Sequence, residues 1–215
     1  LYTMGCNFGD LNNDGYPDFY AATGTPDFRA LVPNRMFLNN KGQRFMDITK
    51  TAGLGHLQKG HGVAFGDIDM DGDQDIYHVL GGSYDGDNFL NALFVNSENQ
   101  NNWVKLKLVG TKANKSAIGA KVKVVAQNEA GETRNFYSRV SSGGSFGANP
   151  LLIEQGLDSY TQINQIEIIW PSQSIQNIHG IQPGGYYVIT EGETRVKKVE
   201  ISAVTLKGEE GHHHH

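Results

Sequence analysis

The chain has 215 residues, of which 38% are hydrophobic and 10% aromatic, so it is long enough to bury a core in one large domain or two small ones. Its net charge of −5 argues against a general nucleic-acid binder, and no apolar run is long enough for a transmembrane helix. The 27 glycines favour many short strands and tight turns, and a single cysteine, Cys6, excludes an internal disulfide.

Acidic residues are concentrated in the first half of the chain. Residues 1–98 carry 13 Asp and Glu against 6 Lys and Arg, whereas residues 99–215 carry 10 against 12. This change predicts a domain boundary near residue 98. The final GHHHH is a purification tag and takes no part in the fold. We therefore expect domains at 1–98 and 99–192, followed by a C-terminal strand or tail with the tag at 193–215.

The first half contains an internal repeat with a constant offset of 57 residues. Residues 5–20 align with residues 62–77, and the match continues from 34–39 to 91–96. Short runs rich in aromatic and β-branched residues predict strands, which in the first unit are residues 19–22, 36–38 and 44–48. Three or four short strands per unit is the content of a β-propeller blade. Two blades cannot close a ring, so we expect a C-terminal fragment whose N-terminal blades are missing.

Each unit carries an acidic loop with oxygen-bearing side chains at loop positions 1, 3, 5 and 9 and glycine at position 6. The predicted side-chain ligands are Asp10, Asn12, Asp14 and Asp18 in the first loop and Asp67, Asp69, Asp71 and Asp75 in the second. The main-chain carbonyls of Tyr16 and Asp73, at position 7, are the natural fifth ligands. Calcium takes six to eight oxygens, so the loops predict two Ca²⁺ ions, with Mg²⁺ as the alternative.

An EF-hand is disfavoured, because it requires a glutamate at position 12 and a helix on each side. Position 12 is Ala21 in the first loop and His78 in the second, and the flanking residues are strand-like. The second loop has four carboxylates at ligand positions and the first has three. Affinity rises with ligand charge, so we expect the second loop to hold its ion more tightly.

The repeat resembles the FG-GAP or VCBS family of calcium-binding propeller repeats. The residues that carry the resemblance are Phe8-Gly9-Asp10, Phe65-Gly66-Asp67, and the segments 34–40, 45–49 and 52–54. The resemblance covers residues 4–97. It implies that the metal is structural and pins the turn between two strands of a blade.

The second half predicts a small all-β domain, most simply a sandwich. Residues 103–108 and 121–124 alternate apolar and basic, which indicates strands with one buried face. Residues 135–140, 163–170 and 186–190 add further strands. The fold class predicted for the whole chain is therefore all-β, with two propeller-type blades followed by a β-sandwich.

This half resembles the ASPIC/UnbV domain over about residues 99–192. The residues that carry the resemblance lie at 102–108, 118–122, 142–146, 156–157 and 168–172. Gln173 stands where the family usually has glycine after Trp-Pro-Ser. The order of the two parts resembles the C-terminal part of a cartilage acidic protein-like molecule.

No set of residues predicts catalysis. Residues 143–147 match the G-x-S-x-G pattern of a hydrolase, but no helical pattern follows, so a glycine-rich turn is expected. His56, His61, His78 and His179 lack partners at metal-ligand spacing. Trp103 and Trp170 are expected to be packing residues, with a sugar-stacking platform as the alternative.

The sequence thus favours a non-enzymatic, calcium-binding module for adhesion or recognition, secreted or at the cell surface, with an unknown protein or glycan ligand. The alternative is a glycan-acting extracellular enzyme or a carbohydrate-binding module. An enzyme would require an acidic pair outside the loops, and Glu154, Asp158 and Glu167 are scattered along the chain. If calcium is structural, its removal is expected to lower the thermal midpoint of residues 1–98 and to spare residues 99–192.

Overall fold

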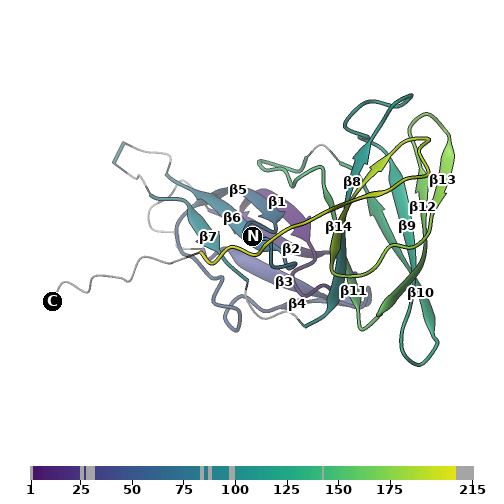
Figure 1. The fold of residues 1–215 in the computed structure, drawn as a ribbon. Helices are drawn as coiled ribbons and strands as arrows, with labels where there is room; N and C mark the ends of the chain where they lie inside the picture. The colour runs from purple at the N-terminus through teal and green to yellow at the C-terminus, as the bar shows by residue number, and fades with distance from the viewer. Residues whose placement is uncertain are drawn as a thin grey trace.

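The computed structural model describes residues 2–24, 27, 32–82, 85–86, 89–96, 100–141 and 143–206, and within these ranges it contains fifteen strands and no helix (Figure 1). The fold is all-β, as the sequence predicts. The described residues accordingly offer no helix with the length and hydropathy needed to cross a membrane. The predicted domain boundary near residue 98 and the tag lie outside the described residues.

The first repeat unit forms one antiparallel sheet. Its strands, in the spatial order β1-β2-β3-β4, are β1 (Thr3–Gly9), β2 (Asp18–Thr23), β3 (Arg35–Asn40) and β4 (Arg44–Asp47). The strands predicted at 19–22, 36–38 and 44–48 are therefore confirmed as β2, β3 and β4.

The second unit repeats the first three strands and lacks the fourth. Its sheet has the order β5-β6-β7, with β5 (Gly60–Gly66), β6 (Asp75–Leu80) and β7 (Ala92–Phe94). An offset of 57 residues would place the counterpart of β4 at 101–104, but most of these residues belong to a strand of another sheet. These two sheets, the N-terminal sheets, share one core, which includes Tyr20, Met36, Val63, Phe65 and Ile76.

The second half forms two further sheets, the C-terminal sheets. One has the order β10-β9-β12-β13, with β9 (Lys121–Gln127), β10 (Thr133–Arg139), β12 (Gln162–Ile169) and β13 (Ile175–Ile178). The other has the order β11-β8-β14-β15, with β8 (Asn102–Val109), β11 (Ile153–Asp158), β14 (Gly185–Thr190) and β15 (Lys197–Val199). Strands β8 and β14 are parallel, and the other paired strands are antiparallel.

Alternating apolar residues from both C-terminal sheets meet in a second core. It includes Leu106 and Ile189 from one sheet and Val124, Phe136 and Ile166 from the other. Figure 1 shows these two sheets facing each other, beside the N-terminal sheets. The described residues thus form four sheets of three or four strands each, which is the size of the sheets from which β-propellers are built. In this sense the arrangement is propeller-like.

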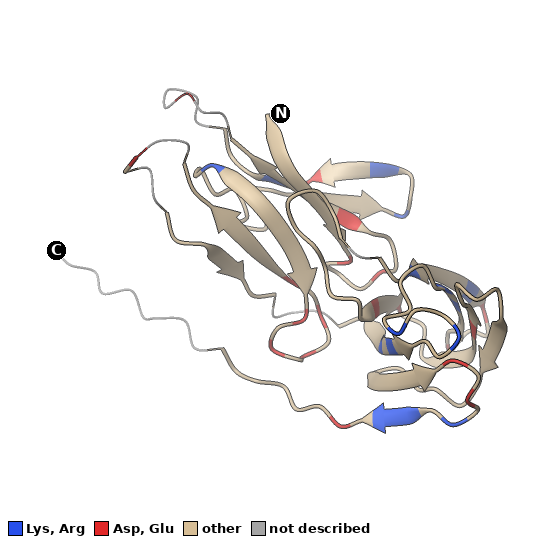
Figure 2. Ribbon diagram, turned by 90° about the horizontal axis from the view of Figure 1, so that it is seen from above, with Lys and Arg blue, Asp and Glu red and all other residues tan. Residues whose placement is uncertain are grey.

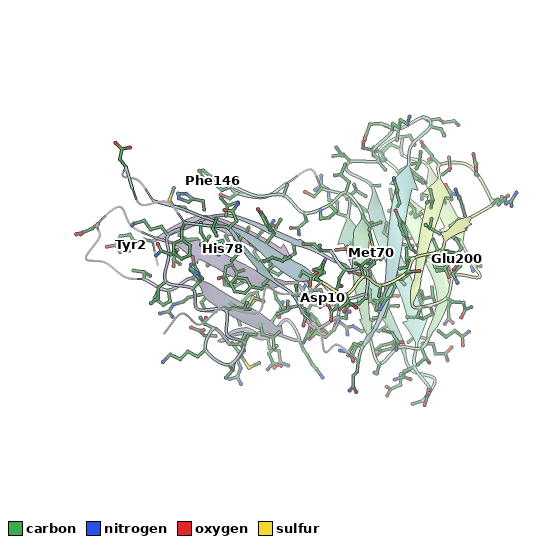
Figure 3. The ribbon with its side chains drawn as sticks, turned by 60° about the vertical axis from the view of Figure 1, so that its left-hand side comes forward. Tyr2, Asp10, Met70, His78, Phe146 and Glu200 are labelled. Atoms are coloured by element: carbon green, nitrogen blue, oxygen red, sulfur yellow. The ribbon has the colours of Figure 1, made fainter. Side chains whose placement is uncertain are left out.

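The connection between β10 and β11 reaches back over the N-terminal sheets. Ser145 forms a β-bridge with Cys6, and Figure 3 places Phe146 over these sheets. The side-chain oxygen of Asn149 accepts hydrogen bonds from Asn7 Nδ2 at 2.7 Å and from the Phe65 N–H at 2.9 Å. These contacts tie the two halves of the chain together.

The same connection contains the G-x-S-x-G pattern. The Gly144 N–H donates to the Gly147 carbonyl at 2.8 Å, and Ser145 is exposed. Residues 147–150 continue in irregular backbone, so the strand-Ser-helix geometry of a nucleophile elbow is not formed. Where a glycine-rich β-turn is predicted, the structure has the β-bridge of Ser145 and a bend at Phe146.

Candidate metal centres in two acidic loops

The first loop, residues 10–18, connects β1 to β2, and the second loop, residues 67–75, connects β5 to β6. The two backbones turn in the same way, because φ is positive at position 4 (Asn13, 53°; Met70, 63°) and at position 6 (Gly15, 82°; Gly72, 108°). Both loops lie at the end of the N-terminal sheets that faces the C-terminal sheets, and acidic residues gather there (Figure 2). Asp10 accordingly lies between the two groups of sheets in Figure 3.

In the first loop, the carboxylates at positions 1 and 9 brace the turn. The two oxygens of Asp10 accept hydrogen bonds from the N–H groups of Asp14 (3.0 Å) and Gly15 (2.8 Å). Asp18 accepts from the N–H of Asn39 in β3 at 2.7 Å. Asp10 and Asp18 are buried, so these bonds fix the loop against the sheet from which it emerges.

The second loop repeats this bracing. Asp67 accepts from the N–H groups of Asp71 (3.1 Å) and Gly72 (2.7 Å), and Asp75 accepts from the Asn96 N–H at 2.9 Å. Asp67, Asp69 and Asp71 each bring one carboxylate oxygen within 4.8 Å of the others. Three of the four predicted side-chain ligands of this loop therefore lie close together. Asp75 accepts from the Ile68 N–H at 2.8 Å within the loop and thus links the loop to the chain after β7.

The remaining predicted ligands of the first loop lie at its tip. Asn12 Oδ1 accepts from the Asp14 N–H at 3.3 Å, and Asn12 Nδ2 lies 3.3 Å from Asp14 Oδ2. Asp14 Oδ1 accepts from the N–H of Tyr16 at 2.9 Å. Positions 3, 5 and 7 thus lie next to one another, as a shared cation would require.

The surroundings of several loop carboxylates disfavour their ionised form. Burial, together with the charges of neighbouring carboxylates, raises the pKa of Asp10 and of Asp73 to about 7 and that of Asp18 to about 6. The same causes raise the pKa of Asp69 and Asp75. A cation bound among them would offset both effects.

Asp73 gives a second sign of a cation. Its side chain is buried, and Oδ1 has no hydrogen-bond partner among the described residues. Buried polar atoms without a partner are uncommon, and an ion is one of the groups that can satisfy them. The sequence predicts only the main-chain carbonyl of this residue as a ligand, since position 7 ordinarily contributes its carbonyl. The donor set therefore fits a hard cation such as calcium.

The C-terminal sheets cover the first loop. The Asp158 N–H donates to the Asn13 carbonyl at 2.8 Å, and Arg134 Nη1 donates to the Asp14 carbonyl at 2.9 Å. Gly156 in β11 lies so close that a β-carbon there would collide with Oδ2 of Asp10. The loop is therefore part of an interface as well as a turn.

The second loop is covered by β8. Lys105 forms an ion pair with Oδ2 of Asp67, and both side chains are about 1% exposed. The indole of Trp103 lies where a β-carbon of Gly72 would be, which requires glycine at this position for packing as well as for its positive φ. The apolar–basic alternation of β8 predicts one buried face and places Lys105 on the other. The expectation is wrong for Lys105 because the loop of another sheet covers that face.

A chain of hydrogen bonds joins the two loops. Gln74 Oε1 accepts from the Asp10 N–H at 2.7 Å, and Gln74 Nε2 donates to Glu154 Oε2 at 2.7 Å. Glu154 Oε1 accepts in turn from the Asp67 N–H at 3.2 Å. Burial raises the pKa of Glu154. Sequence reasoning missed Gln74 and Lys105, because neither lies at a ligand position.

The acids that are scattered in the sequence have separate partners. Glu154 belongs to the chain of hydrogen bonds between the loops, Asp158 lies 3.6 Å from Arg134, and Glu167 lies 3.0 Å from Lys123. Their positions in the fold do not form the acidic pair that an enzyme of this kind would need.

The two tryptophans are packing residues, as predicted. Trp170 is buried in the core of the C-terminal sheets and donates through Nε1 to Gln176 Oε1 at 3.0 Å. Trp103 lies against the second loop.

A cleft of about 680 Å³ lies beside the first loop, between β1 and the strands β10 and β11. Its lining includes Phe8, Tyr137, Arg139, Asn149 and Gln155. Phe8 is 53% exposed and Tyr137 is 71% exposed. Two open aromatic rings beside amide and guanidinium groups give the cleft both a stacking surface and hydrogen-bond donors.

Comparison with known proteins assigns both halves of the chain. Residues 10–78 match the model of the FG-GAP-like repeat, and residues 110–196 match the model of the ASPIC and UnbV family. A search of curated proteins found no match. The chain therefore carries a segment that matches the FG-GAP-like repeat, followed by a segment that matches the ASPIC and UnbV family.

Proposed function

We propose that this chain is a non-enzymatic, calcium-binding module for adhesion or recognition, secreted or at the cell surface. FG-GAP repeats and ASPIC/UnbV domains are modules of the extracellular type, and extracellular calcium is abundant enough to fill loops of this kind. In this proposal the N-terminal sheets are two propeller blades, the C-terminal sheets are a sandwich, and further blades belong to a longer protein.

The observation that carries the proposal is the position of both loops at the junction between the two groups of sheets. The convergence of Asp67, Asp69 and Asp71 and the orphaned oxygen of Asp73 support one ion in the second loop. The matching backbone turns support an equivalent ion in the first loop. Each ion would hold its loop in the shape on which the C-terminal sheets dock, which is a structural role.

Calorimetry tests the metal content. We expect two calcium ions per chain, with Asp14→Ala and Asp71→Ala each losing one. Magnesium should bind more weakly, because rigid octahedral coordination suits these loops less well. A wild-type chain that binds no calcium at millimolar concentration would overturn the proposal.

Scanning calorimetry tests the structural role. A ligand that binds only the folded state adds about 2.7 kcal/mol at a hundred times its Kd. Chelation should therefore lower the unfolding midpoint of the N-terminal sheets by several degrees and leave the core of the C-terminal sheets less affected. A midpoint of the N-terminal sheets that chelation leaves unmoved, in protein shown to be loaded with calcium, would contradict the structural role.

A second candidate function is carbohydrate binding, by a glycan-acting enzyme or a non-catalytic module. The cleft beside the first loop favours it, because the open rings of Phe8 and Tyr137 could stack on sugar faces. A glycan array with wild type and Tyr137→Ala tests this function. Binding that is lost in the variant would support it, and equal signals would exclude this cleft.

A further inference from the structure

Lys105 has an environment that no other described lysine shares. Its ammonium group is buried at about 1% exposure, and it forms an ion pair with Asp67, the first residue of the second loop. The charge of Glu154 also acts on this site, and Nζ lies 5.4 Å from the centre of the Trp103 ring. A buried ammonium is costly unless it is paired, so its neighbours must compensate its charge.

The two oxygens of Asp67 have different neighbours. Oδ2 receives the ammonium of Lys105 and the N–H of Gly72, whereas Oδ1 receives the N–H of Asp71. Lys105 therefore occupies Oδ2 of the loop's first carboxylate, which leaves Oδ1 to the Asp71 N–H and to a cation shared with Asp69 and Asp71.

Among the residues that the structure describes, no cation pairs with the equivalent atom of the first loop, Oδ2 of Asp10. Oδ2 of Asp10 faces Gly156, which brings backbone and no charge. The nearest described cation of the C-terminal sheets at this loop, Arg134, binds the main-chain carbonyl of Asp14. The two loops therefore differ in charge in two ways. The first has Asn12 where the second has Asp69, and the second is paired with the buried ammonium of Lys105.

We propose that Lys105 is a built-in counter-cation of the second loop. It offsets one negative charge of the loop when calcium is absent, and it lowers the affinity of the loop for calcium below the value that four carboxylates would give. The second statement rests on the proposed calcium function, whereas the first does not. Lys105 would therefore weaken, without removing, the dependence of the docked second loop on calcium.

Calcium titration of the full chain tests the effect on affinity. Asp14→Ala removes a ligand of the first loop, so that titration reports the second. In this background we expect Lys105→Met to raise calcium affinity by about tenfold or more, since like charges a few ångströms apart in a buried site repel strongly. Lys107→Met is the matched control, because Lys107 is exposed on the same strand, and it should leave affinity unchanged. An affinity that Lys105→Met leaves unchanged or lowers would overturn the proposal.

Unfolding of the calcium-free protein tests the counter-cation itself. Lys105→Met and Asp67→Asn should each lower the midpoint, and the double variant should lose less than the two losses added together, because each single variant leaves a buried charge unpaired. Lys105→Arg keeps the positive charge, so its affinity for calcium should lie in the wild-type range and not in the raised range expected for Lys105→Met. Additive losses in the cycle would overturn the proposal.

These results distinguish the two proposals. If neither wild type nor Lys105→Met binds calcium, the proposed function fails, and competition between lysine and calcium fails with it. If wild type binds calcium and Lys105→Met binds it equally well, only the role of Lys105 fails. If Lys105→Met folds only with calcium, the ion replaces the missing ammonium, which supports the proposal.

Discussion

At the scale of single residues, the buried carboxylates of the loops determine how the calcium-free protein responds to pH. The pKa is raised to about 7 at Asp10 and Asp73 and to about 6 at Asp18, against about 3.9 in an unfolded chain. Between these values the folded state binds more protons, so its stability falls as pH rises from about 4 to 7. We expect protein freed of calcium by dialysis to melt several degrees lower at pH 7.5 than at pH 5.5.

Calcium should reverse this trend, because it binds the ionised carboxylates and competes with protons. Melting curves in excess calcium should therefore rise with pH over the same range. A calcium-free protein that became more stable with rising pH would show that the loop carboxylates ionise freely.

His78 gives an opposite and smaller pH effect. It is fully buried against the ring of Tyr20, and neither ring nitrogen has a hydrogen-bond partner among the described residues. Burial lowers its pKa to about 4, with help from the charges of His56 and His61. Folding therefore loses stability at this residue as pH falls below about 6.5, where the unfolded chain takes up the proton.

We expect His78→Leu to keep the midpoint at pH 7 or raise it, because it removes two unsatisfied nitrogens. The free energy of unfolding of His78→Leu relative to wild type should be about 1–2 kcal/mol more favourable at pH 5 than at pH 7. Chemical denaturation at both pH values measures this difference. The exposed residue His179 supplies the control, and a gain of the same size in His179→Leu would contradict the explanation.

At the scale of elements, Glu191 joins three segments of the C-terminal sheets. One oxygen accepts hydrogen bonds from the N–H groups of Thr111, Lys112 and Ala113 after β8, and the other accepts from Ser172 and Ser174 before β13. Burial would raise its pKa, but these hydrogen bonds outweigh burial and lower the pKa to about 2.

We expect Glu191→Gln to lower the midpoint of the C-terminal sheets, with or without calcium. An amide has one acceptor oxygen where the carboxylate has two. The contribution of Glu191 is present above about pH 4.5 and is lost as pH falls towards 2, because its folded pKa is the lower one. Scanning calorimetry of Glu193→Gln, two residues further along the chain, is the comparison. An equal loss in both variants would argue against this role.

At the scale of the whole molecule, the interface makes the tryptophans separate reporters. Trp103 lies against the second loop, and Trp170 lies in the core of the C-terminal sheets. In Trp170→Phe, chelation should shift the emission of Trp103 to longer wavelength if calcium helps the sheets to dock. In Trp103→Phe, the emission of Trp170 should not change. If emission shifted in Trp103→Phe but not in Trp170→Phe, calcium would be acting on the core of the C-terminal sheets, which contradicts this prediction.

The sequence predicts the local features of this molecule well, because they depend on short spacings. The 57-residue repeat locates both loops, and the alternation of apolar and basic residues locates β8 and β9. It does not predict that Lys105 is buried, because alternation describes two faces of a strand and not what covers the second. It likewise leaves Glu154 without a partner, since Gln74 lies 80 residues away and meets it only when the two halves dock.

The cover over the second loop also bears on how fast an ion can leave. Asp67 and Asp69 are buried, Trp103 lies against Gly72, and the Val204 N–H donates to the Asp69 carbonyl at 2.7 Å, so the C-terminal segment lies over the loop as well. In the proposed site the exposed Asp71 marks the open side, and we expect the cover on the other sides to slow the release of an ion. The residence time of calcium would then depend in part on the opening rate of the interface, and the protein would remain loaded through brief falls in the concentration of calcium around it.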